Sequence, residues 1–306
     1  MTLILTANTS ESIWMLADTR LSARGRRPRE DGMKVMCLET TDGTAILGYA
    51  GLGATAAGTQ PANWMSAVLR GRNLPMEQSL GILADALRRQ FPRHLRSLPR
   101  AVPAAHNLLA QCFIDGKPKL FSIDLGLSED RRTHAFRYTR HVVGDVTDPS
   151  ARTPRLGVAG SGAPGLLSDK RWMRELLRLL RAYDRGAVTG LQVADTLAAL
   201  NYKVHMSLSD ESVGPRCVVV WRNRRGSPHK TGGAHQFFDG RTREHNSPGI
   251  PTIAIGMDAL AVQTLALKNM AELMRGKTRE QFASIDFSKV HEGIDKLPDK
   301  PDENLR

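Results

Sequence analysis

The chain has 306 residues, enough for one large domain or two average ones, and 41% hydrophobic with 24% charged residues is ordinary for a soluble globular protein. No apolar run approaches the roughly 18 residues of a membrane span, and the N-terminus lacks the basic flank of a signal peptide, so we expect a cytoplasmic protein outside any membrane. The net charge of +12 permits nucleic-acid binding, but aromatic residues are only 5% and no nucleic-acid-binding motif is visible, which argues against that partner.

The first fifty residues are predicted to form strands. Thr2–Ala7 and Ser12–Asp18 are short runs rich in β-forming residues, and a second pair follows at Met33–Glu39 and Thr44–Ala50. Between the pairs, Leu21–Gly32 contains glycine, proline and arginine. It is long enough to be a functional loop rather than a simple turn.

Helical periodicity then takes over. In Met76–Gln90 the apolar residues share one face, and Pro92 is expected to end that helix. Further strands are predicted at about Asn107–Ile114, Lys119–Asp124, Ala135–Val143 and Leu156–Ala159, the last of which ends in Gly160-Ser161-Gly162.

Two more helices and one more strand complete this part of the chain. The helix Lys170–Arg185 carries arginines at steps of three and four, opposite an apolar face, and a second helix is expected near Leu191–His205. Arg216–Trp221 is a buried strand. Strands joined by short turns imply antiparallel sheets, and helices in pairs imply outer layers. We therefore predict an α+β protein, a four-layer αββα sandwich of two antiparallel sheets, rather than a doubly wound parallel sheet.

The amino-acid composition becomes more polar after residue 222, so we predict a domain over 1–222 and a C-terminal extension over 223–306. Arg222–Gly249 is polar and is interpreted as a linker or an exposed loop, and Ile253–Ile255 as a short strand. Asp258 is placed to cap an apolar helix of about 258–275, which we expect to be buried because it is apolar almost all round. The charged end Asp295–Arg306 is expected to be disordered.

Cysteines and histidines give no sign of a disulfide or a metal site. Cys37, Cys112 and Cys217 are odd in number and widely spaced, which favours buried free thiols. The nine histidines show no ligand spacing. We therefore expect neither a metal nor a cofactor.

The most informative residue is Thr2. Its small side chain favours removal of Met1, which would expose a hydroxyl nucleophile and a primary amine on one residue. The amine has an ordinary pKa of about 7.7–8.0, so it can take the hydroxyl proton as a general base. A nearby lysine ammonium would favour the alkoxide, and a carboxylate would hold that lysine in place. Asp18 and Lys34 stand on neighbouring predicted strands and are available for these roles.

These residues resemble the catalytic proteasome β-subunits and their bacterial relatives HslV and the ancestral β-subunit Anbu. The likeness is carried by Thr2-Leu3-Ile4-Leu5-Thr6-Ala7, Leu16-Ala17-Asp18-Thr19-Arg20, Lys34-Val35 and Gly48-Tyr49-Ala50-Gly51. In that family an aspartate and a lysine follow the threonine by sixteen and thirty-two positions, as Asp18 and Lys34 follow Thr2 here. Gly160-Ser161-Gly162 and Ser212-Val213-Gly214-Pro215 extend the likeness over about residues 2–222, which implies an N-terminal-nucleophile hydrolase fold.

The resemblance also implies a role for each matching residue. Thr2 would be the nucleophile and supply the base, Asp18 would pair with Lys34, and the backbone N–H of Gly51 would stabilise the oxyanion. Ser161 and Asp210 would bracket the amine.

The position of the last of these is left open. The family places an aspartate three residues before the serine of its Ser-Gly motif, whereas Asp210 is two before Ser212 and Ser209 is three before it. Either a one-residue shift brings Asp210 to the amine, or Ser209 takes that place.

The predicted function is that of a threonine-type endopeptidase, a hydrolase that cuts polypeptides inside a self-assembled homo-oligomeric ring. The resemblance implies this assembly and places the arginine-bearing helix at subunit contacts. It does not say whether an ATP-dependent unfoldase takes part. Two alternatives remain: an amidase for a small amide with the same residues, or a non-catalytic scaffold of proteasome-like fold. Thr2, Asp18 and Lys34 together argue against the scaffold, because it needs none of them.

Overall fold

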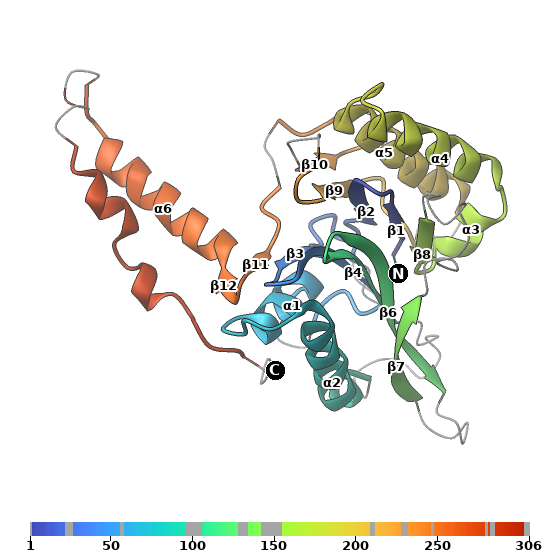
Figure 1. The fold of residues 1–306 in the computed structure, drawn as a ribbon, viewed down its shortest axis with the longest axis horizontal. Coiled ribbons are helices and arrows are strands. Elements are labelled where there is room, and N and C mark those ends of the chain that lie inside the picture. The colour runs from blue at the N-terminus through green and yellow to red at the C-terminus, as the bar shows by residue number, and fades with distance from the viewer. Residues whose placement is uncertain are drawn as a thin grey trace.

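The computed structural model describes residues 2–21, 27–55, 58–95, 106–127, 134–141, 155–208, 212–227, 232–245, 248–278, 281 and 285–302. It is a mixed α+β protein with two sheets and several helices (Figure 1). None of the helices in these ranges combines the length and apolar character needed to cross a bilayer.

One sheet has five strands in the order β10-β9-β2-β1-β8, and every neighbouring pair is antiparallel. The N-terminal strand β1 therefore lies between β2 and β8, so both of its edges are paired. The strand bounds are β1 Ile4–Asn8, β2 Ser12–Asp18, β8 Arg155–Ala159, β9 Cys217–Asn223 and β10 Gly233–Phe237.

The other sheet has seven strands in the order β12-β11-β3-β4-β5-β6-β7. All its pairs are antiparallel except β11 with β3, which run parallel. The bounds are β3 Val35–Glu39, β4 Gly43–Ala50, β5 Asn107–Ile114, β6 Lys117–Leu127, β7 His134–His141, β11 Thr252–Ala254 and β12 Met257–Asp258. The end of the predicted strand Ala135–Val143 lies outside the described residues.

Several helices cover the two sheets, and others lie beside them. Their bounds are α1 Pro61–Leu69, α2 Met76–Leu95, α3 Ala163–Leu167, α4 Arg171–Asp184, α5 Gly190–Ser207 and α6 Ala259–Met274, with two short 3-10 helices, η3 Phe287–His291 and η4 Ile294–Lys296. The sequence did not predict α1 or α3. The predicted stop at Pro92 was wrong, because α2 continues to Leu95: one missing backbone donor did not end the helix.

Alternation along the strands separates the core into three clusters. Between the sheets, Ile4 and Met15 of the first sheet pack with Cys37, Ile46 and other residues of the second. The strand residues that alternate with these point the other way, as a period of two requires. Cys37, Cys112 and Cys217 are buried free thiols, as expected from the sequence.

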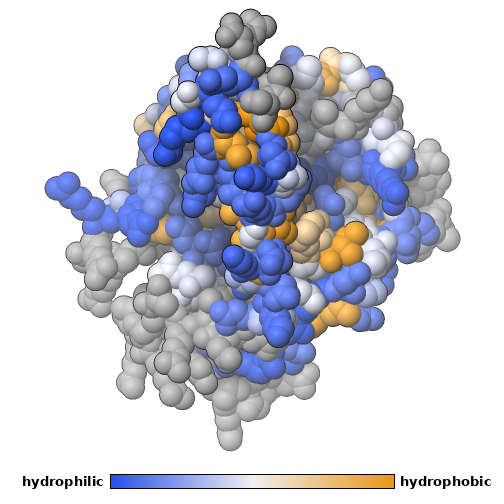
Figure 2. All heavy atoms as spheres, turned by 90° about the vertical axis from the view of Figure 1, so that its left-hand side faces the viewer, coloured by the Kyte–Doolittle hydropathy of each residue, from blue (hydrophilic) through white to orange (hydrophobic). Residues whose placement is uncertain are grey.

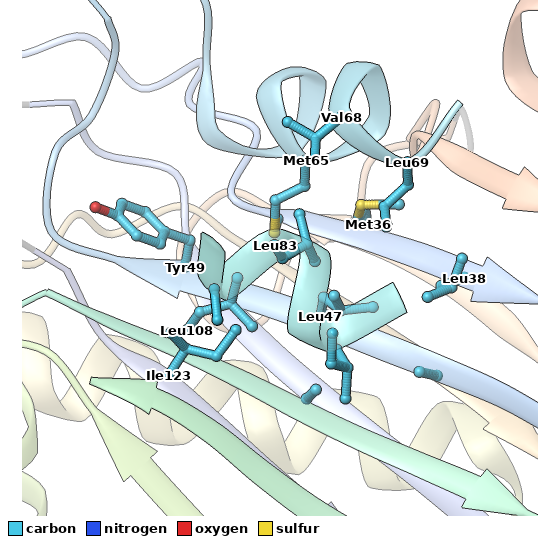
Figure 3. Close-up of a cluster of buried hydrophobic side chains, with 14 of the residues drawn as sticks. Met36, Leu38, Leu47, Tyr49, Met65, Val68, Leu69, Leu83, Leu108 and Ile123 are labelled. Carbon is cyan, nitrogen blue, oxygen red and sulfur yellow. The ribbon is translucent and has the colours of Figure 1, made fainter. Parts of the chain in front are cut away.

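The outward-facing residues of each sheet are covered by a pair of helices. Met36, Leu38 and Leu47 pack against Met65 of α1 and Leu83 of α2 (Figure 3). On the five-stranded sheet the covering helices are α4 and α5, and the cluster there contains Leu3, Leu5, Trp14, Leu176 and Leu197 among others. Thr2 thus enters a strand whose two faces are both buried.

The segment predicted to be a linker carries a strand. β10 pairs with β9 from Gly233↔Trp221 to Phe237↔Cys217 and extends the five-stranded sheet. The following β11 adds to the seven-stranded sheet beside β3. Residues beyond 222 therefore contribute to both sheets, while the division into two domains at that residue stays a prediction.

The C-terminal helix α6 was expected to be buried, but it is not. Asp258 caps it by accepting a hydrogen bond from the Ala261 N–H at 3.0 Å, as predicted, but none of its residues is buried. It projects from the body and packs along η3 (Figure 1). The face that carries it shows apolar side chains between hydrophilic ones (Figure 2). Leu267 is 57% exposed, so an apolar composition here does not correspond to burial.

The sequence predicts a disordered chain end, but the part up to residue 302 is hydrogen-bonded to the rest of the protein. The Asp302 N–H donates to the Ala67 carbonyl at 2.9 Å, and Arg70 Nε donates to the Lys300 carbonyl at 3.1 Å. These bonds hold the segment against the end of α1. They supply the backbone partners that a charged, proline-containing sequence cannot provide from its own local structure.

Candidate active site

Thr2 lies two residues before the start of β1 and is buried, with 2% of its surface exposed. Its backbone N–H donates to Ser161 Oγ at 3.0 Å, and its carbonyl accepts from the Gly162 N–H at 3.2 Å. Both partners belong to the turn between β8 and α3, which the antiparallel β1–β8 pairing brings to the N-terminal end of β1. The backbone of Thr2 is therefore held on one side by this turn.

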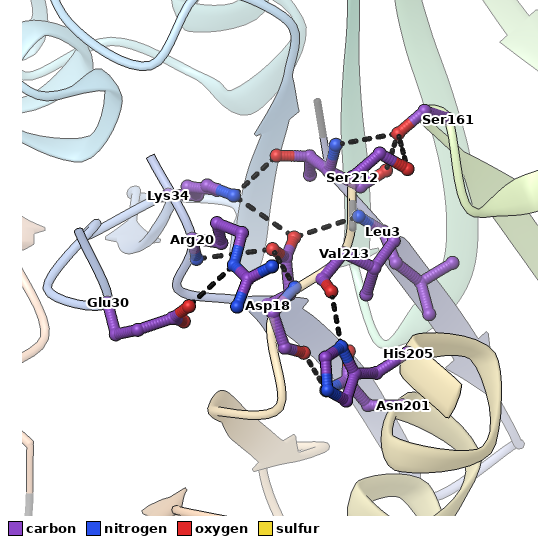
Figure 4. Close-up of polar contacts among 12 residues, drawn as sticks. Leu3, Asp18, Arg20, Glu30, Lys34, Ser161, Asn201, His205, Ser212 and Val213 are labelled. Atoms are coloured by element: carbon purple, nitrogen blue, oxygen red, sulfur yellow. Dashed lines mark hydrogen bonds and ion pairs between the residues drawn. The ribbon is translucent and has the colours of Figure 1, made fainter. Parts of the chain in front are cut away.

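Lys34 approaches the same residue from the second sheet. It stands directly before β3, and its Nζ donates hydrogen bonds to Thr2 Oγ1 and to Asp18 Oδ1, the latter at 3.0 Å (Figure 4). Burial lowers the pKa of Lys34 from its ordinary value, and the charge of Asp18 opposes that shift. The lysine Nζ thus contacts the hydroxyl of Thr2 and the carboxylate of Asp18 at the same time.

Asp18, the last residue of β2, accepts four hydrogen bonds. Oδ1 takes one from Lys34 Nζ and one from the Leu3 N–H, the latter at 2.8 Å. Oδ2 takes one each from the N–H groups of Arg20 and Gly214, both at 3.2 Å. All four donors are N–H groups, for which a carboxylate is the matching acceptor. Asp18 therefore ties the lysine to the backbone beside Thr2.

Gly160 explains why the turn carrying Ser161 can come so close. Its φ is +93°, and a Cβ at this position would lie 2.1 Å from the Thr2 carbonyl oxygen. Any other residue would push Thr2 away. The same Cβ position is 3.4 Å from Ala50 Cβ, so the end of β4 also lies beside Thr2.

Gly51 follows β4 and has a φ of +142°. Among the described residues its backbone N–H has no hydrogen-bond partner, whereas the next N–H, that of Leu52, donates to His106 Nδ1 at 3.2 Å. An unpaired N–H beside a nucleophile is the kind of donor that can bind a carbonyl oxygen as negative charge develops on it.

Two residues of this region carried no role in the sequence analysis. Ser212 appeared there only within a motif, and its Oγ accepts from Ser161 Oγ at 3.2 Å, so it extends the polar contacts of Thr2 by one step. His106 was missed altogether. It directly precedes β5, and a Cβ on Gly51 would lie 2.1 Å from its Nδ1. A lone histidine without motif spacing gives no signal in the sequence.

The structure brings four predicted site residues into one hydrogen-bonded group: Thr2, Asp18, Lys34 and Ser161. Gly51 directly follows β4, the strand next to β3. Asp210 and the alternative Ser209 lie outside the described residues, so the choice between them stays open. In the described ranges no three or more metal-ligating side chains come together. The group can activate a hydroxyl by acid–base and electrostatic means.

Comparisons with known proteins give similar structures only. No family model and no curated protein matches the chain. Among solved structures, Anbu (ancestral β-subunit) from Yersinia bercovieri is 15% identical, with a TM-score of 0.48 over 80% of this chain and 89% of that one. The helical assembly of the Anbu complex from Pseudomonas aeruginosa is 14% identical, with a TM-score of 0.48 over 91% and 99%. An Anbu (Gly-1) mutant from Hyphomicrobium sp. strain MC1 is 14% identical, with a TM-score of 0.46 over 94% and 98%.

Proposed function

We propose that this protein, once Met1 has been removed, is a threonine-type N-terminal-nucleophile hydrolase that cuts peptide bonds. The observation that carries the proposal is the bridge made by Lys34 Nζ, which donates to Thr2 Oγ1 on one side and to Asp18 on the other. A buried lysine serving only the fold would need the carboxylate but would not need to contact a hydroxyl at the chain end. The two sheets and their covering helices are proposed to be the αββα sandwich of such hydrolases.

The reaction begins at the Thr2 hydroxyl. Its oxygen attacks the carbonyl carbon of the scissile bond while the proton passes to the α-amine of Thr2, directly or through a water. The Lys34 ammonium stabilises the developing alkoxide and disfavours a proton on the amine. Ser161 Oγ, which accepts from the Thr2 nitrogen at 3.0 Å, would orient the amine.

The tetrahedral intermediate carries a negative oxygen, for which the Gly51 N–H is the available donor. Loss of one such donor costs about 100- to 1000-fold in rate in a comparable acyl transfer. As the intermediate collapses, the leaving amine takes the proton from the Thr2 amine and an ester remains on Thr2 Oγ1. Water, deprotonated by the same amine, then cleaves the ester and restores the hydroxyl.

Self-association is part of the proposal. α6 is apolar in composition and exposes Leu267, Met270 and Met274, which a protein working alone would leave in water. Assembly of several copies would cover such a helix and enclose the site, restricting access to unfolded chains. The exposed arginines of α4 would then lie at contacts between subunits.

The test is an intact-mass measurement after incubation with a peptide β-lactone, which transfers its acyl group to a reactive hydroxyl. We expect a wild-type chain without Met1 and one adduct, mapped to Thr2. Thr2→Ala serves as the control, because alanine also allows Met1 to be removed but offers no oxygen, so no adduct should form. Met1 retained on the purified wild-type chain, or an adduct elsewhere, would contradict the proposal.

A second assay distinguishes the substrates. The proposed peptidase releases fragments from an unfolded protein such as casein and loses this activity in Thr2→Ala. An enzyme that is acylated but turns over only small amides is the amidase instead. A chain that is never acylated, although Met1 is gone, is a scaffold.

A further inference from the structure

His106 is a buried titratable residue that the proposed reaction does not use. Its imidazole sits at the turn after β4: Nδ1 accepts from the Leu52 N–H at 3.2 Å and lies 2.9 Å from the Tyr49 hydroxyl. The ring of Phe91 meets it edge-on, with centroids 4.2 Å apart at 71°. Four elements of structure thus converge on one ring beside Gly51: the end of β4, the turn after it, α2 and the start of β5.

The protonation state of this ring follows from its contacts. A backbone N–H can only donate, so the Nδ1 that receives the Leu52 N–H must be an unprotonated acceptor. Burial lowers the pKa of His106 to about 4, which keeps the ring neutral at working pH. With Nδ1 as the acceptor the ring proton lies on Nε2, and the Tyr49 hydroxyl, which itself also accepts from the Leu52 N–H, shares Nδ1 with that N–H.

The geometry of Gly51 makes this acceptor important. Its φ and ψ set the angle between two peptide planes, one bearing the Gly51 N–H and the other the Leu52 N–H. A glycine has no Cβ to restrict these angles, and its φ of +142° lies where other residues rarely go. On the upstream side the chain is held by the pairing of Ala50 with Asn107 in the sheet. On the downstream side the hydrogen bond from Leu52 to His106 holds it.

Packing alone does not fix the turn. Leu52, Ala54 and Thr55 line an apolar cavity of about 40 Å³, which also reaches Leu87 and Phe91. The turn therefore has room to relax on that side, and the hydrogen bond to His106 is a specific restraint on it.

We propose that His106 is a positioning residue that holds the Gly51 N–H in place to bind the oxyanion, by accepting the N–H of Leu52. This inference rests on the proposed function and deepens it. It requires an acceptor at the Nδ1 position and assigns His106 no proton transfer and no contact with substrate.

The test compares His106→Leu, which fills the space without an acceptor, with His106→Asn, whose side-chain oxygen can replace Nδ1. Two reagents are used. A peptide β-lactone passes through a tetrahedral oxyanion, whereas a peptide vinyl sulfone adds Thr2 Oγ1 to a carbon–carbon double bond and forms none. Leu87→Ala is the matched control, because Leu87 is buried and lines the same cavity but makes no hydrogen bond to the turn.

We expect His106→Leu to slow the β-lactone reaction by about 10- to 100-fold, since a donor is displaced rather than deleted. Its vinyl sulfone reaction should stay within about threefold of wild type, and His106→Asn should recover most of the lost β-lactone rate. Leu87→Ala should leave both reactions near wild type. Hydrogen exchange at the Leu52 amide gives a readout without chemistry: it should become faster in His106→Leu and remain slow in His106→Asn.

The results separate this inference from the proposed function. A wild-type protein that reacts with neither reagent overturns the proposed function and the role of His106 with it. If the wild type reacts but His106→Leu matches its β-lactone rate, only the role of His106 is overturned. Equal slowing of both reagents in His106→Leu, or no recovery in His106→Asn, would show that the ring merely supports the fold.

Discussion

Lys34 Nζ lies 3.0 Å from Asp18 Oδ1 in an ion pair whose two side chains are 2% and 0% exposed. The lysine stands directly before β3 of one sheet and the aspartate at the end of β2 in the other, so the pair joins the sheets beside Thr2. Burial lowers the pKa of Lys34, and the charge of Asp18 is the largest influence that raises it. The pair therefore tunes the same ammonium that contacts the Thr2 hydroxyl.

The first prediction concerns the pH dependence of acylation. The Thr2 amine must be neutral to accept a proton, and Lys34 must be charged to stabilise the alkoxide. We therefore expect the rate of the β-lactone reaction to follow a bell-shaped pH profile. On the acid side the rate falls as the Thr2 amine becomes protonated, at or below the ordinary pKa of such an amine, about 7.7–8.0. The alkaline limb follows loss of the Lys34 proton and lies below 10.5, because burial lowers that pKa. A rate that still rises above this pH would contradict the assignment.

Asp18→Asn tests the origin of the alkaline limb. It removes the negative charge that raises the pKa of Lys34, so the limb should move to lower pH. Glu30→Gln is the graded control, since Glu30 raises the same pKa by a smaller amount and should shift the limb less in the same direction. Rate profiles of the three proteins, measured on the same reagent, give the comparison. An alkaline limb that does not move in Asp18→Asn would mean that another group titrates there.

A second prediction is an asymmetry in stability between the two partners of this ion pair. Asp18→Ala leaves a buried ammonium without its carboxylate and three backbone N–H groups without their acceptor. Lys34→Met leaves the carboxylate with the N–H groups of Leu3, Arg20 and Gly214. We expect Asp18→Ala to lower the free energy of unfolding by about 3–5 kcal/mol and Lys34→Met by clearly less. Urea unfolding at pH 7 measures both, and equal losses would refute the account.

A third prediction uses two glycines of similar backbone conformation. Gly160 has φ +93° and a Cβ there would meet the Thr2 carbonyl, whereas Gly186 has φ +71° and nothing within 4 Å of its Cβ position. Alanine at either position should cost about 1–3 kcal/mol of stability from backbone strain. Only Gly160→Ala should also displace Thr2 and slow its β-lactone reaction, by at least about 100-fold, the scale expected when a small misplacement spoils the geometry. If Gly186→Ala slowed the β-lactone reaction to a similar extent, contact of the new Cβ with Thr2 would not be the cause.

Much of the strand layout was predictable because it follows local pattern. The runs at β1 to β5 alternate or are wholly apolar, and the short turns from β1 to β2 and from β3 to β4 force these two pairs to be antiparallel. The grouping of Thr2, Asp18 and Lys34 was predictable for a different reason. Their spacing resembles a known family, and each residue stands at a strand end, where the pairing of β1 with β2 brings Leu3 to Asp18.

What was missed depends on partners distant in sequence. In α1 eight of nine residues are buried, so no polar face produces a helical period. β10 looks like a polar linker, and it is a strand because β9 offers a free edge. His106 acquires its hydrogen bonds only once β5 is paired with β4. A pattern confined to neighbouring residues cannot show any of these.

The last prediction concerns α6 and self-association. Leu267 on this helix is 57% exposed, whereas Leu176 of α4 is fully buried. In a dilute, monomeric sample Leu267→Gln should change the free energy of unfolding by no more than about 0.5 kcal/mol, while Leu176→Ala should cost about 2–5 kcal/mol. If copies associate through α6, the melting temperature of the wild type rises with protein concentration, because association stabilises only the folded state. Leu267→Gln should weaken that dependence, and Leu176→Ala should keep it at a lower melting temperature. Sedimentation at the same concentrations checks the size directly. A wild-type melting temperature independent of concentration, with a monomer throughout, would show that α6 remains in water and that assembly does not enclose the site.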